Sequence, residues 1–186
     1  MKRLLLNIVG FKTAWLTCAF GAAVNGWIPV AVIAVLISIH LTVAERWLPE
    51  LRLILLVGVL GAIVDSSLGL FGVMTYVVGD STSQLAPPWL IALWMSFATV
   101  LPYGLRWLST KPLVSIVMGA AAGPASYYGG SKAGAVIMGD ALIFSLVAIG
   151  VAWALVMPLI SWLSRQPYFD AHDIKPVIAD AEAVAN

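Results

Sequence analysis

The sequence contains about six long apolar segments, and this feature constrains the fold more than any other. A helix needs about 20 apolar residues to cross the hydrocarbon core of a bilayer. Only 10% of the residues are charged, whereas a soluble domain carries about 25%. We therefore expect an all-α membrane protein, a compact bundle of six transmembrane helices. The predicted spans lie near residues 4–23, 27–45, 52–73, 88–108, 112–130 and 135–163.

The basic residues give this bundle an orientation. Of the ten Lys and Arg residues, eight lie before the first span, after the last span, or in the loops between spans two and three and spans four and five. These positions share one side of the membrane if there are six spans, and the other side holds only Lys132. Because cytoplasmic loops carry an excess of Lys and Arg, both termini are predicted to be cytoplasmic. The expected location is the bacterial inner (cytoplasmic) membrane, crossed several times.

Two segments outside the spans are long enough to interpret. Residues 1–164 would form the transmembrane domain, and residues 165–186 a short tail that acidic residues keep solvated. We expect this tail to be disordered or to form one short surface helix. On the outer side, residues 72–88 contain a turn signal at Gly79–Ser83. We interpret this loop as a simple connector, and a cover over a cavity is the alternative.

Three ionisable residues lie deep in the apolar segments: Lys12, Asp65 and Asp140. With a rise of about 1.5 Å per helical residue, the two Asp residues lie at one depth, and Lys12 and His40 lie nearer to the cytoplasm. Ionisable groups inside a membrane are costly and commonly mark a functional site. The spacing favours an ion pair between Lys12 and either Asp65 or Asp140, and does not decide between them.

These residues predict a polar pocket in the middle of the membrane. Such a pocket would bind the head group of a ligand or relay a proton, and the alternative is an ion pair that only fixes helix packing. For His40 alone, a structural hydrogen bond is the favoured interpretation. Pro102 should kink the fourth span and free a carbonyl group beside Tyr103. The predicted binding residues are Lys12, Asp65, Asp140, His40, Ser66 and Tyr103.

No motif for catalysis or for a cofactor is present. The sequence lacks a phosphate-binding loop, a nucleophile elbow, an HExxH zinc motif and a dinucleotide fingerprint. Cys18 is the single cysteine, and His40 is the single histidine within the spans, so a metal site rich in Cys or His is not expected. We predict no catalytic residue, no metal and no cofactor. The net charge of +1 gives no basis for a nucleic-acid partner.

The fifth predicted span is rich in small residues. Gly119–Gly123 is a run of Gly and Ala that lets helix backbones approach closely, and Pro124 follows it. Tight helix packing is the favoured interpretation. A broken helix whose freed backbone groups face a ligand is the alternative.

Four groups of residues carry a resemblance to a known family. They are Asn7 with Gly10–Trp15, Pro88–Leu90 with Leu93-Trp94 and Phe97–Thr99, Leu105–Leu108, and Gly119-Ala120 with Gly123-Pro124 and Tyr127. On these motifs the chain resembles an uncharacterised family of small six-span bacterial inner-membrane proteins, known only as a domain of unknown function. The resemblance brings no established activity and implies only a setting among genes for unusual fatty-acid or lipid modification. In architecture alone, the chain is similar to the substrate-binding subunits of energy-coupling-factor transporters.

Three functions remain open at this point. The leading hypothesis is a module that binds or transports a small amphiphilic or lipid-derived molecule through the polar pocket, surrounded by membrane lipids. The second is an enzyme, or an accessory subunit of one, in membrane lipid or fatty-acid modification, where Lys12 and the two carboxylates would do acid–base work. The third is a scaffold that holds a partner membrane protein on an exposed small-residue face such as Gly119–Gly123. The sequence favours a protein that is not an enzyme, and leaves the ligand and the oligomeric state open.

Overall fold

The computed structural model describes residues 2–172, with side chains from residue 5 onward. These residues form six α-helices, one 3₁₀ helix and a three-stranded sheet. In chain order the elements are α1 (Lys2–Gly21), α2 (Trp27–Val43), α3 (Trp47–Leu70), β1 (Met74–Val78), β2 (Ser81–Ser83), α4 (Pro88–Ala98), η1 (Arg106–Thr110), α5 (Pro112–Lys132), β3 (Val136–Met138) and α6 (Leu142–Leu163).

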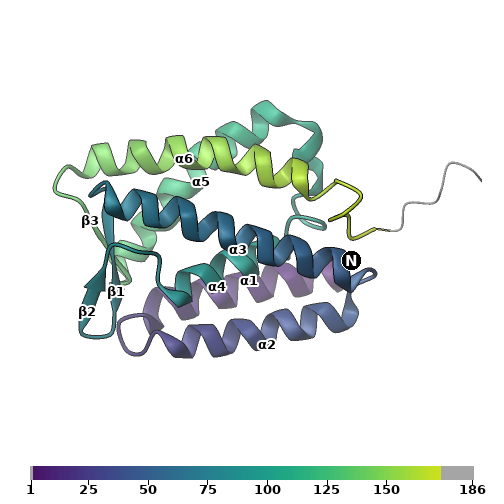
Figure 1. The fold of residues 1–186 in the computed structure, drawn as a ribbon, viewed down its shortest axis with the longest axis horizontal. Coiled ribbons are helices and arrows are strands. Elements are labelled where there is room, and N and C mark those ends of the chain that lie inside the picture. The colour runs from purple at the N-terminus through teal and green to yellow at the C-terminus, as the bar shows by residue number, and fades with distance from the viewer. Residues whose placement is uncertain (1, 173–186) are drawn as a thin grey trace, which may run out of the picture.

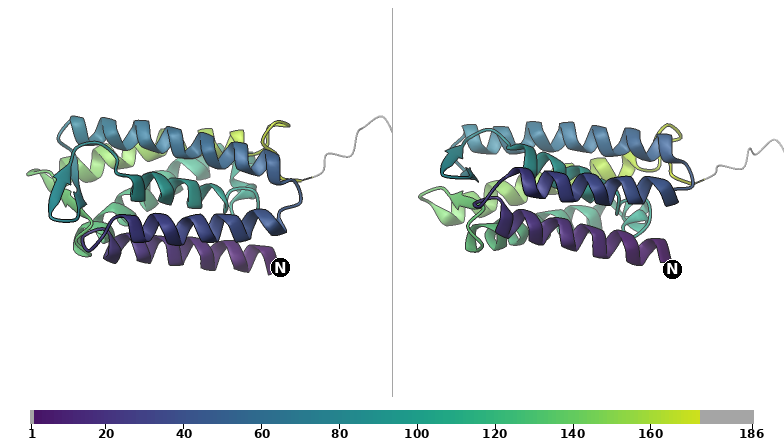
Figure 2. Two further views of the ribbon diagram at one scale, coloured as in Figure 1. Left: turned by 60° about the horizontal axis from the view of Figure 1, so that its bottom comes forward. Right: turned by 90° about the horizontal axis from the view of Figure 1, so that it is seen from below.

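The helices lie along the long axis of the molecule, and the two ends of this bundle differ (Figures 1 and 2). The sheet lies at one end, and the start of α1, the α2–α3 connection, η1 and the residues after α6 lie at the other. The chain passes along the bundle in alternating directions. α4, the turns after it and η1 together make one of these passages.

The fold is mostly helical, as expected, but it is not all-α. β1 pairs antiparallel with both β2 and β3, so the strand order is β2-β1-β3. The connection from β1 to β2 begins with Gly79, whose φ of 59° is a conformation that favours glycine. The loop expected to be a connector therefore forms a hairpin, with Tyr76 opposite Ser83.

β3 occupies residues where the sixth span was expected to begin. α6 starts at Leu142 instead of near residue 135. Gly134, with a φ of 89°, redirects the chain after α5, and residues 136–138 then pair with β1. The prediction was wrong here because a short apolar run does not distinguish a buried strand from a helix.

α4 is the central helix of the bundle. It contacts α1, α2 and α3, and its side chains after Pro88 are buried or half-buried. The fourth span was expected to run to residue 108 with a kink at Pro102, but α4 ends at Ala98 and turns follow. Proline lacks an N–H group and disfavours a helical residue before it, so the helix ends instead of bending. At about 16 Å, α4 is too short to cross a bilayer alone.

Two helices are long and apolar enough to cross a membrane by length and composition, α3 and α6. Three shorter apolar helices are residues 5–21 of α1, α2 and α4. The described part of the chain therefore supports an association with a membrane, and the six separate spans remain a prediction.

α5 is one continuous helix with Pro124 inside it. Gly119 and Gly123 face α6: a Cβ atom on Gly119 would lie 2.4 Å from the carbonyl oxygen of Trp153, and one on Gly123 would lie 2.4 Å from Cγ of the same residue. The small residues thus allow close packing, as favoured from the sequence. The alternative of a helix broken after Gly123 is wrong.

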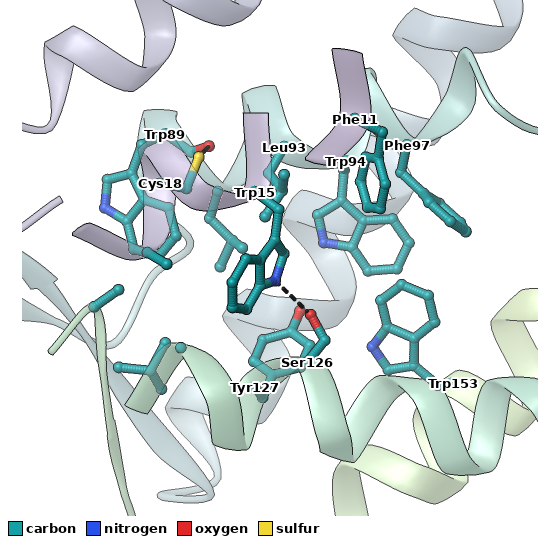
Figure 3. A pocket seen from close by; sticks show the side chains of 15 residues that line it. Phe11, Trp15, Cys18, Trp89, Leu93, Trp94, Phe97, Ser126, Tyr127 and Trp153 are labelled. Carbon is teal, nitrogen blue, oxygen red and sulfur yellow. Dashed lines mark hydrogen bonds between the residues drawn. The ribbon is translucent and has the colours of Figure 1, made fainter. Parts of the chain in front are cut away.

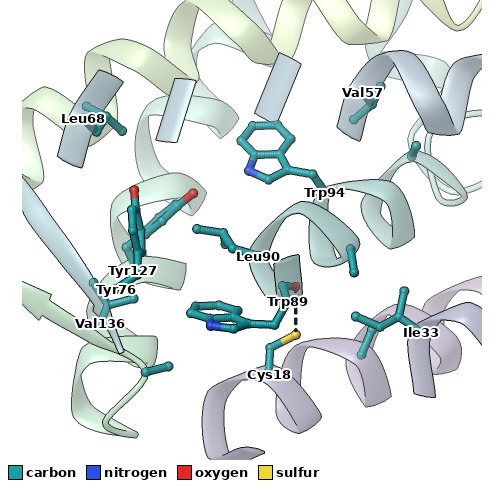
Figure 4. Packing of buried hydrophobic residues seen from close by; sticks show 14 of the residues in the cluster. Cys18, Ile33, Val57, Leu68, Tyr76, Trp89, Leu90, Trp94, Tyr127 and Val136 are labelled. Atoms are coloured by element: carbon teal, nitrogen blue, oxygen red, sulfur yellow. Dashed lines mark hydrogen bonds between the residues drawn. The ribbon is translucent and has the colours of Figure 1, made fainter. Parts of the chain in front are cut away.

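The hydrophobic core extends from the helices to the sheet (Figure 4). Leu90 and Trp94 of α4 lie between Val57 of α3 and Ile33 of α2, and Val136 of β3 belongs to the same buried cluster. The indole Nε1 of Trp89 also donates to the backbone oxygen of Val77, at 3.1 Å. The sheet is therefore part of the core and is attached to the central helix.

The residues after α6 turn back onto the end of the bundle opposite the sheet. Asp170 and Ala171 are buried there. The tail was expected to be disordered or to form one surface helix, but residues 165–172 form ordered turns. The prediction for residues 173–186 lies outside the described residues.

Candidate functional site

Asp65 on α3 is the centre of a fully buried polar cluster. Nε1 of Trp94 donates to Oδ2 at 2.7 Å, and the hydroxyl of Tyr127 donates to Oδ1 at 2.6 Å. The hydroxyl of Tyr76 donates to the backbone oxygen of Asp65, also at 2.7 Å. Neutral aromatic donors from α4, α5 and β1 thus hold one acidic residue of α3.

Glycines explain how the tryptophans reach this position. A Cβ atom on Gly61, about one turn before Asp65, would lie 2.1 Å from Cγ of Trp94. Trp94 stacks on Trp153 of α6, with ring centroids 4.6 Å apart and an interplanar angle of 18°. Gly123 leaves the corresponding space for Trp153. Two glycines therefore make room for the tryptophan pair that links Asp65 to α6.

An aromatic pocket lies beside this cluster, between α1, α4, α5, α6 and the start of β3 (Figure 3). It holds about 560 Å³ of space, part of which is open to the outside. Phe11, Leu93 and Phe97 belong to its apolar wall. The side chains labelled in Figure 3 are Phe11, Trp15, Cys18, Trp89, Leu93, Trp94, Phe97, Ser126, Tyr127 and Trp153.

The aromatic pocket also has a polar side. Nε1 of Trp15 donates to Oγ of Ser126 at 2.9 Å, and Tyr127 follows in the chain. Nε1 of Trp153 is buried and makes no hydrogen bond of normal geometry within residues 5–172, although it lies near the hydroxyl of Tyr127. A buried N–H group without an acceptor is uncommon in proteins. The pocket thus combines an apolar wall with a donor that is available to a ligand.

A second buried polar cluster lies at the opposite end of the bundle from the sheet. Nδ1 of His40 is 2.8 Å from Oδ1 of Asn7, and Nε2 is 2.5 Å from Oε2 of Glu50. The hydroxyl of Tyr103 donates to Oε1 of Glu50 at 2.6 Å. Because an amide oxygen only accepts, Nδ1 of His40 carries a proton. The four side chains form one hydrogen-bonded chain across α1, α2, α3 and the turns after α4.

A third cluster binds the residues after α6. Arg106 donates to both carboxylate oxygens of Asp170, at 2.8 and 3.2 Å, and Arg46 donates to the backbone oxygen of Asp170 at 3.1 Å. Burial raises the pKa of Asp170, but the hydrogen bonds from Arg106 and from the backbone N–H of His172, together with the positive charge of Arg106, outweigh it. The pKa of Asp170 is therefore below its usual value.

The structure brings some predicted binding residues together and separates others. His40 and Tyr103 both bind Glu50, whereas Asp65 belongs to the other buried cluster. Ser66 accepts a hydrogen bond from the backbone N–H of Ala86 at 3.1 Å, and so holds the segment before α4.

The predicted ion pair of Lys12 with Asp65 or Asp140 is wrong. Both carboxylate oxygens of Asp65 are bonded to aromatic side chains inside the bundle, whereas Lys12 and Asp140 are exposed. Asp140 precedes α6 instead of lying within it. For Lys12, the position along the helix gives a depth, but it does not give the face of the helix on which the side chain lies.

The predicted binding residues leave out several residues of these clusters and of the aromatic pocket: Asn7, Glu50, Trp94, Tyr127 and Trp153. Glu50 lies in the first turn of α3, where the helix dipole commonly favours a carboxylate. A carboxylate at that position is typical of an ordinary helix start, so it did not indicate a site. A signal was nevertheless present, because Asn7 interrupts the first apolar run in the same way that His40 interrupts the second.

No group of three or more His, Cys, Asp or Glu side chains is placed to hold a metal ion in the part of the chain that the structure describes. The groups that gather in the two buried clusters are indole, phenol, amide, imidazole and carboxyl groups. They point to recognition by hydrogen bonds.

Comparison with known proteins gives one match. A family model described as "Protein of unknown function (DUF2878)" matches residues 4–159. No curated protein and no solved structure matches the chain. The matched range contains both buried clusters and the aromatic pocket, and it ends before Asp170. The architectural similarity to energy-coupling-factor subunits stays a prediction.

Proposed function

The chain belongs to the family described as proteins of unknown function (DUF2878), and from its own structure we propose that it is a multi-pass protein of the bacterial inner membrane that binds a small amphiphilic or lipid-derived molecule. The aromatic pocket is the binding site in this proposal. The observation that carries it is an apolar cavity with the unpartnered N–H group of Trp153 in its wall.

The outer surface of the bundle supports the membrane placement. Large apolar side chains are exposed on the helices around α4, among them Val9 (60%), Val59 (58%) and Leu155 (70%). Soluble monomers rarely expose apolar patches larger than a few hundred Å². A surrounding bilayer would cover this surface, and the basic residues at the end opposite the sheet favour the cytoplasm for that end.

The chemistry of the pocket suits an amphiphile. An apolar chain can pack against Phe11 and Phe97, and an oxygen that accepts a hydrogen bond can take the N–H group of Trp153. Asp65 does not line the pocket, but its two partners do. We therefore assign Asp65 a positioning role: it holds Trp94 and Tyr127 in the pocket wall.

The test is to purify the protein in mild detergent and to identify what is bound to it by native mass spectrometry and lipidomics. Trp153→Phe removes the N–H group and keeps an aromatic ring, so the affinity should fall about tenfold, the value of roughly one hydrogen bond, and the bound fraction should fall with it. Trp162→Phe is the matched control, because Trp162 lies on the same helix and is 55% exposed.

Two results would contradict this proposal. Equal retention of the ligand in the Trp153→Phe and Trp162→Phe proteins would remove Trp153 from binding. A protein that never carries a stoichiometric small molecule, even when it is purified from native membranes, would show that the pocket is not a binding site.

A second candidate function is an enzyme, or an accessory subunit of one, in membrane lipid or fatty-acid modification. The observation in its favour is the contact between His40 and Glu50, because an imidazole and a carboxyl group in direct contact can pass a proton between them. Deletion of the gene should then alter the lipid profile, and His40→Gln should fail to restore it. Full restoration by that variant would remove His40 from catalysis.

The scaffold hypothesis keeps only part of its proposed surface. Gly119 and Gly123 are buried against α6, whereas Ala120, Ala121 and Ala122 between them are exposed.

A further inference from the structure

A second cavity lies between α1, α2 and α4, and it shares no lining residue with the aromatic pocket. It holds about 490 Å³ of space, part of which is open to the outside. Most of its wall is aliphatic. Val9 and Ile39 belong to this wall and are also exposed on the outer surface of the bundle, at 60% and 45%. The cavity therefore opens towards the surface that we place in lipid.

One wall of this α1–α2–α4 cavity is polar and contains an unused donor. Asn7 is 3% exposed, and its Oδ1 is engaged by His40. Its Nδ2 group is buried and finds no acceptor among the described residues. The hydroxyl of Thr99, in the same wall, already donates to the backbone oxygen of Ser96 at 2.8 Å. What this wall offers a ligand is thus the amide N–H group of Asn7, together with the hydroxyl groups of Thr13 and Ser96.

A chain of hydrogen bonds fixes the orientation of the Asn7 amide group. Nδ1–H of His40 donates to Oδ1 of Asn7, which turns Nδ2 away from the imidazole ring. Glu50 binds the other ring nitrogen of His40, and Tyr103 binds Glu50. Such outer hydrogen bonds determine the orientation of a side chain that contacts a ligand.

We propose that the α1–α2–α4 cavity binds the carbonyl group of a fatty acyl chain, with Nδ2 of Asn7 as the hydrogen-bond donor and with His40 and Glu50 as positioning residues. A carbonyl oxygen accepts and does not donate, which matches a wall whose free groups can all donate. The aliphatic wall suits the acyl chain. Since both nitrogens of His40 are engaged, the lining offers no free positive charge, so a neutral ester or acid carbonyl fits better than a carboxylate.

This inference adds a second binding site to the proposed function, and it rests on the membrane placement of α1 and α2 proposed above. The carbonyl can come from an ester-linked membrane lipid or from a free fatty acid. Both sources share the chemistry that Asn7 recognises, so the experiment has one arm for each.

The experiment uses the full-length protein in phosphatidylcholine vesicles. One arm contains phosphatidylcholine with a diazirine near the carbonyl end of one acyl chain, and the other contains a fatty acid with the same diazirine. After irradiation, mass spectrometry of peptides locates the crosslinks. We expect crosslinks on the α1 and α2 residues that line the cavity in at least one arm. The arm that gives them identifies the source of the carbonyl group.

Variants then test the donor. Asn7→Leu removes the amide and keeps the branching at Cγ, and Asn7→Asp replaces the donor with an acceptor. Both should lower the crosslink yield on the α1 and α2 cavity peptides about tenfold. Ser38→Ala is the matched control, because the Ser38 hydroxyl on the exposed face of α2 bonds only its own helix, at the backbone oxygen of Ala34.

The positioning role of His40 and Glu50 can be tested separately from the donor role of Asn7. His40→Phe and Glu50→Gln should lower the crosslinks on the cavity peptides while the crosslinks on α5 peptides of the aromatic pocket keep their wild-type yield. A loss of both sets together in these variants would mean that His40 and Glu50 only maintain the fold, and would overturn their assignment.

Two results would overturn the binding site itself. One is an unchanged yield on the cavity peptides in the Asn7→Leu protein, and the other is a crosslink pattern spread evenly over exposed and cavity residues. A protein that does not float with the vesicles would instead refute the membrane placement. A protein that floats but carries no ligand in the aromatic pocket would refute only the site around Trp153.

Discussion

At the scale of single residues, Asp65 shows how a carboxyl group can lie in an apolar bundle without a cation beside it. Each of its oxygens accepts a hydrogen bond from an aromatic side chain, and the residue is fully buried. Buried polar groups are tolerated when they are hydrogen-bonded. The pair of donors, Trp94 and Tyr127, therefore takes the place that we had expected Lys12 to fill.

The variant Asp65→Asn tests this arrangement. An Asn side chain keeps one acceptor oxygen but places an NH₂ group towards Trp94 or Tyr127, so one buried donor loses its partner. We expect the free energy of unfolding to fall by about 1–3 kcal/mol, seen as a lower midpoint in thermal denaturation in detergent. Asp80→Asn, in the exposed turn between β1 and β2, is the control and should leave the midpoint unchanged. Equal midpoints for Asp65→Asn and the wild type would show that the two hydrogen bonds do not stabilise the fold.

The lowered pKa of Asp170 predicts that the stability of the segment after α6 depends on pH. Its pKa in the folded protein lies below its usual value, so its stabilising contribution is complete above the usual pKa and is lost as the pH falls through the lowered one. We expect the protection of residues 165–172 against hydrogen–deuterium exchange to fall over that acidic range. Comparison with Asp170→Asn at each pH cancels the intrinsic exchange rates. A wild-type protein that tracks this variant at every pH would contradict the role of the carboxylate.

At the scale of elements, the close packing of α5 and α6 depends on two glycines. Gly123→Ala would place a methyl group 2.4 Å from Cγ of Trp153, so the indole or the helix must move. Overpacking of this kind costs about 1–3 kcal/mol. We expect a lower thermal midpoint and a changed tryptophan fluorescence spectrum. Gly130→Ala, on the same helix, meets only Val136 at 3.8 Å and should change neither. Similar effects in both variants would point to a general intolerance of α5.

Elements differ in how well the sequence predicts them, and the reasons are physical. α3 and α6 are long and largely apolar, and such runs identify a helix well. The strands do not have that length, and Val136–Met138 is an apolar run that only its partner β1 turns into a strand. The buried clusters were predictable only in part, because spacing along a helix gives the depth of Lys12 but not the direction in which it points. In the sequence, the position of Glu50 is typical of a helix start. Only the fold shows that α2 places His40 against it.

At the scale of the whole molecule, the proposed topology can be tested by labelling introduced cysteines. Asp80→Cys lies at the sheet end and Thr110→Cys at the opposite end, and both positions are exposed. In intact cells whose outer membrane is permeable to it, a maleimide that cannot cross the inner membrane should label Asp80→Cys and not Thr110→Cys. Lysis should expose both. The buried Cys18 should contribute little background. Labelling of Thr110→Cys in intact cells would refute the cytoplasmic assignment of that end.

The contacts of Asp65 also bear on how the chain is made. Trp94 lies 29 residues further along the sequence and Tyr127 lies 62 residues further. During synthesis from the N-terminus, Asp65 is therefore incorporated before either donor. In the proposed membrane protein, Asp65 therefore has neither hydrogen-bond donor until α4 and then α5 reach it in the membrane or at the insertion machinery. A nascent chain that stops short of α5 keeps an unsatisfied carboxyl group in an apolar segment. This defect would mark incomplete molecules for the quality-control proteases of the membrane.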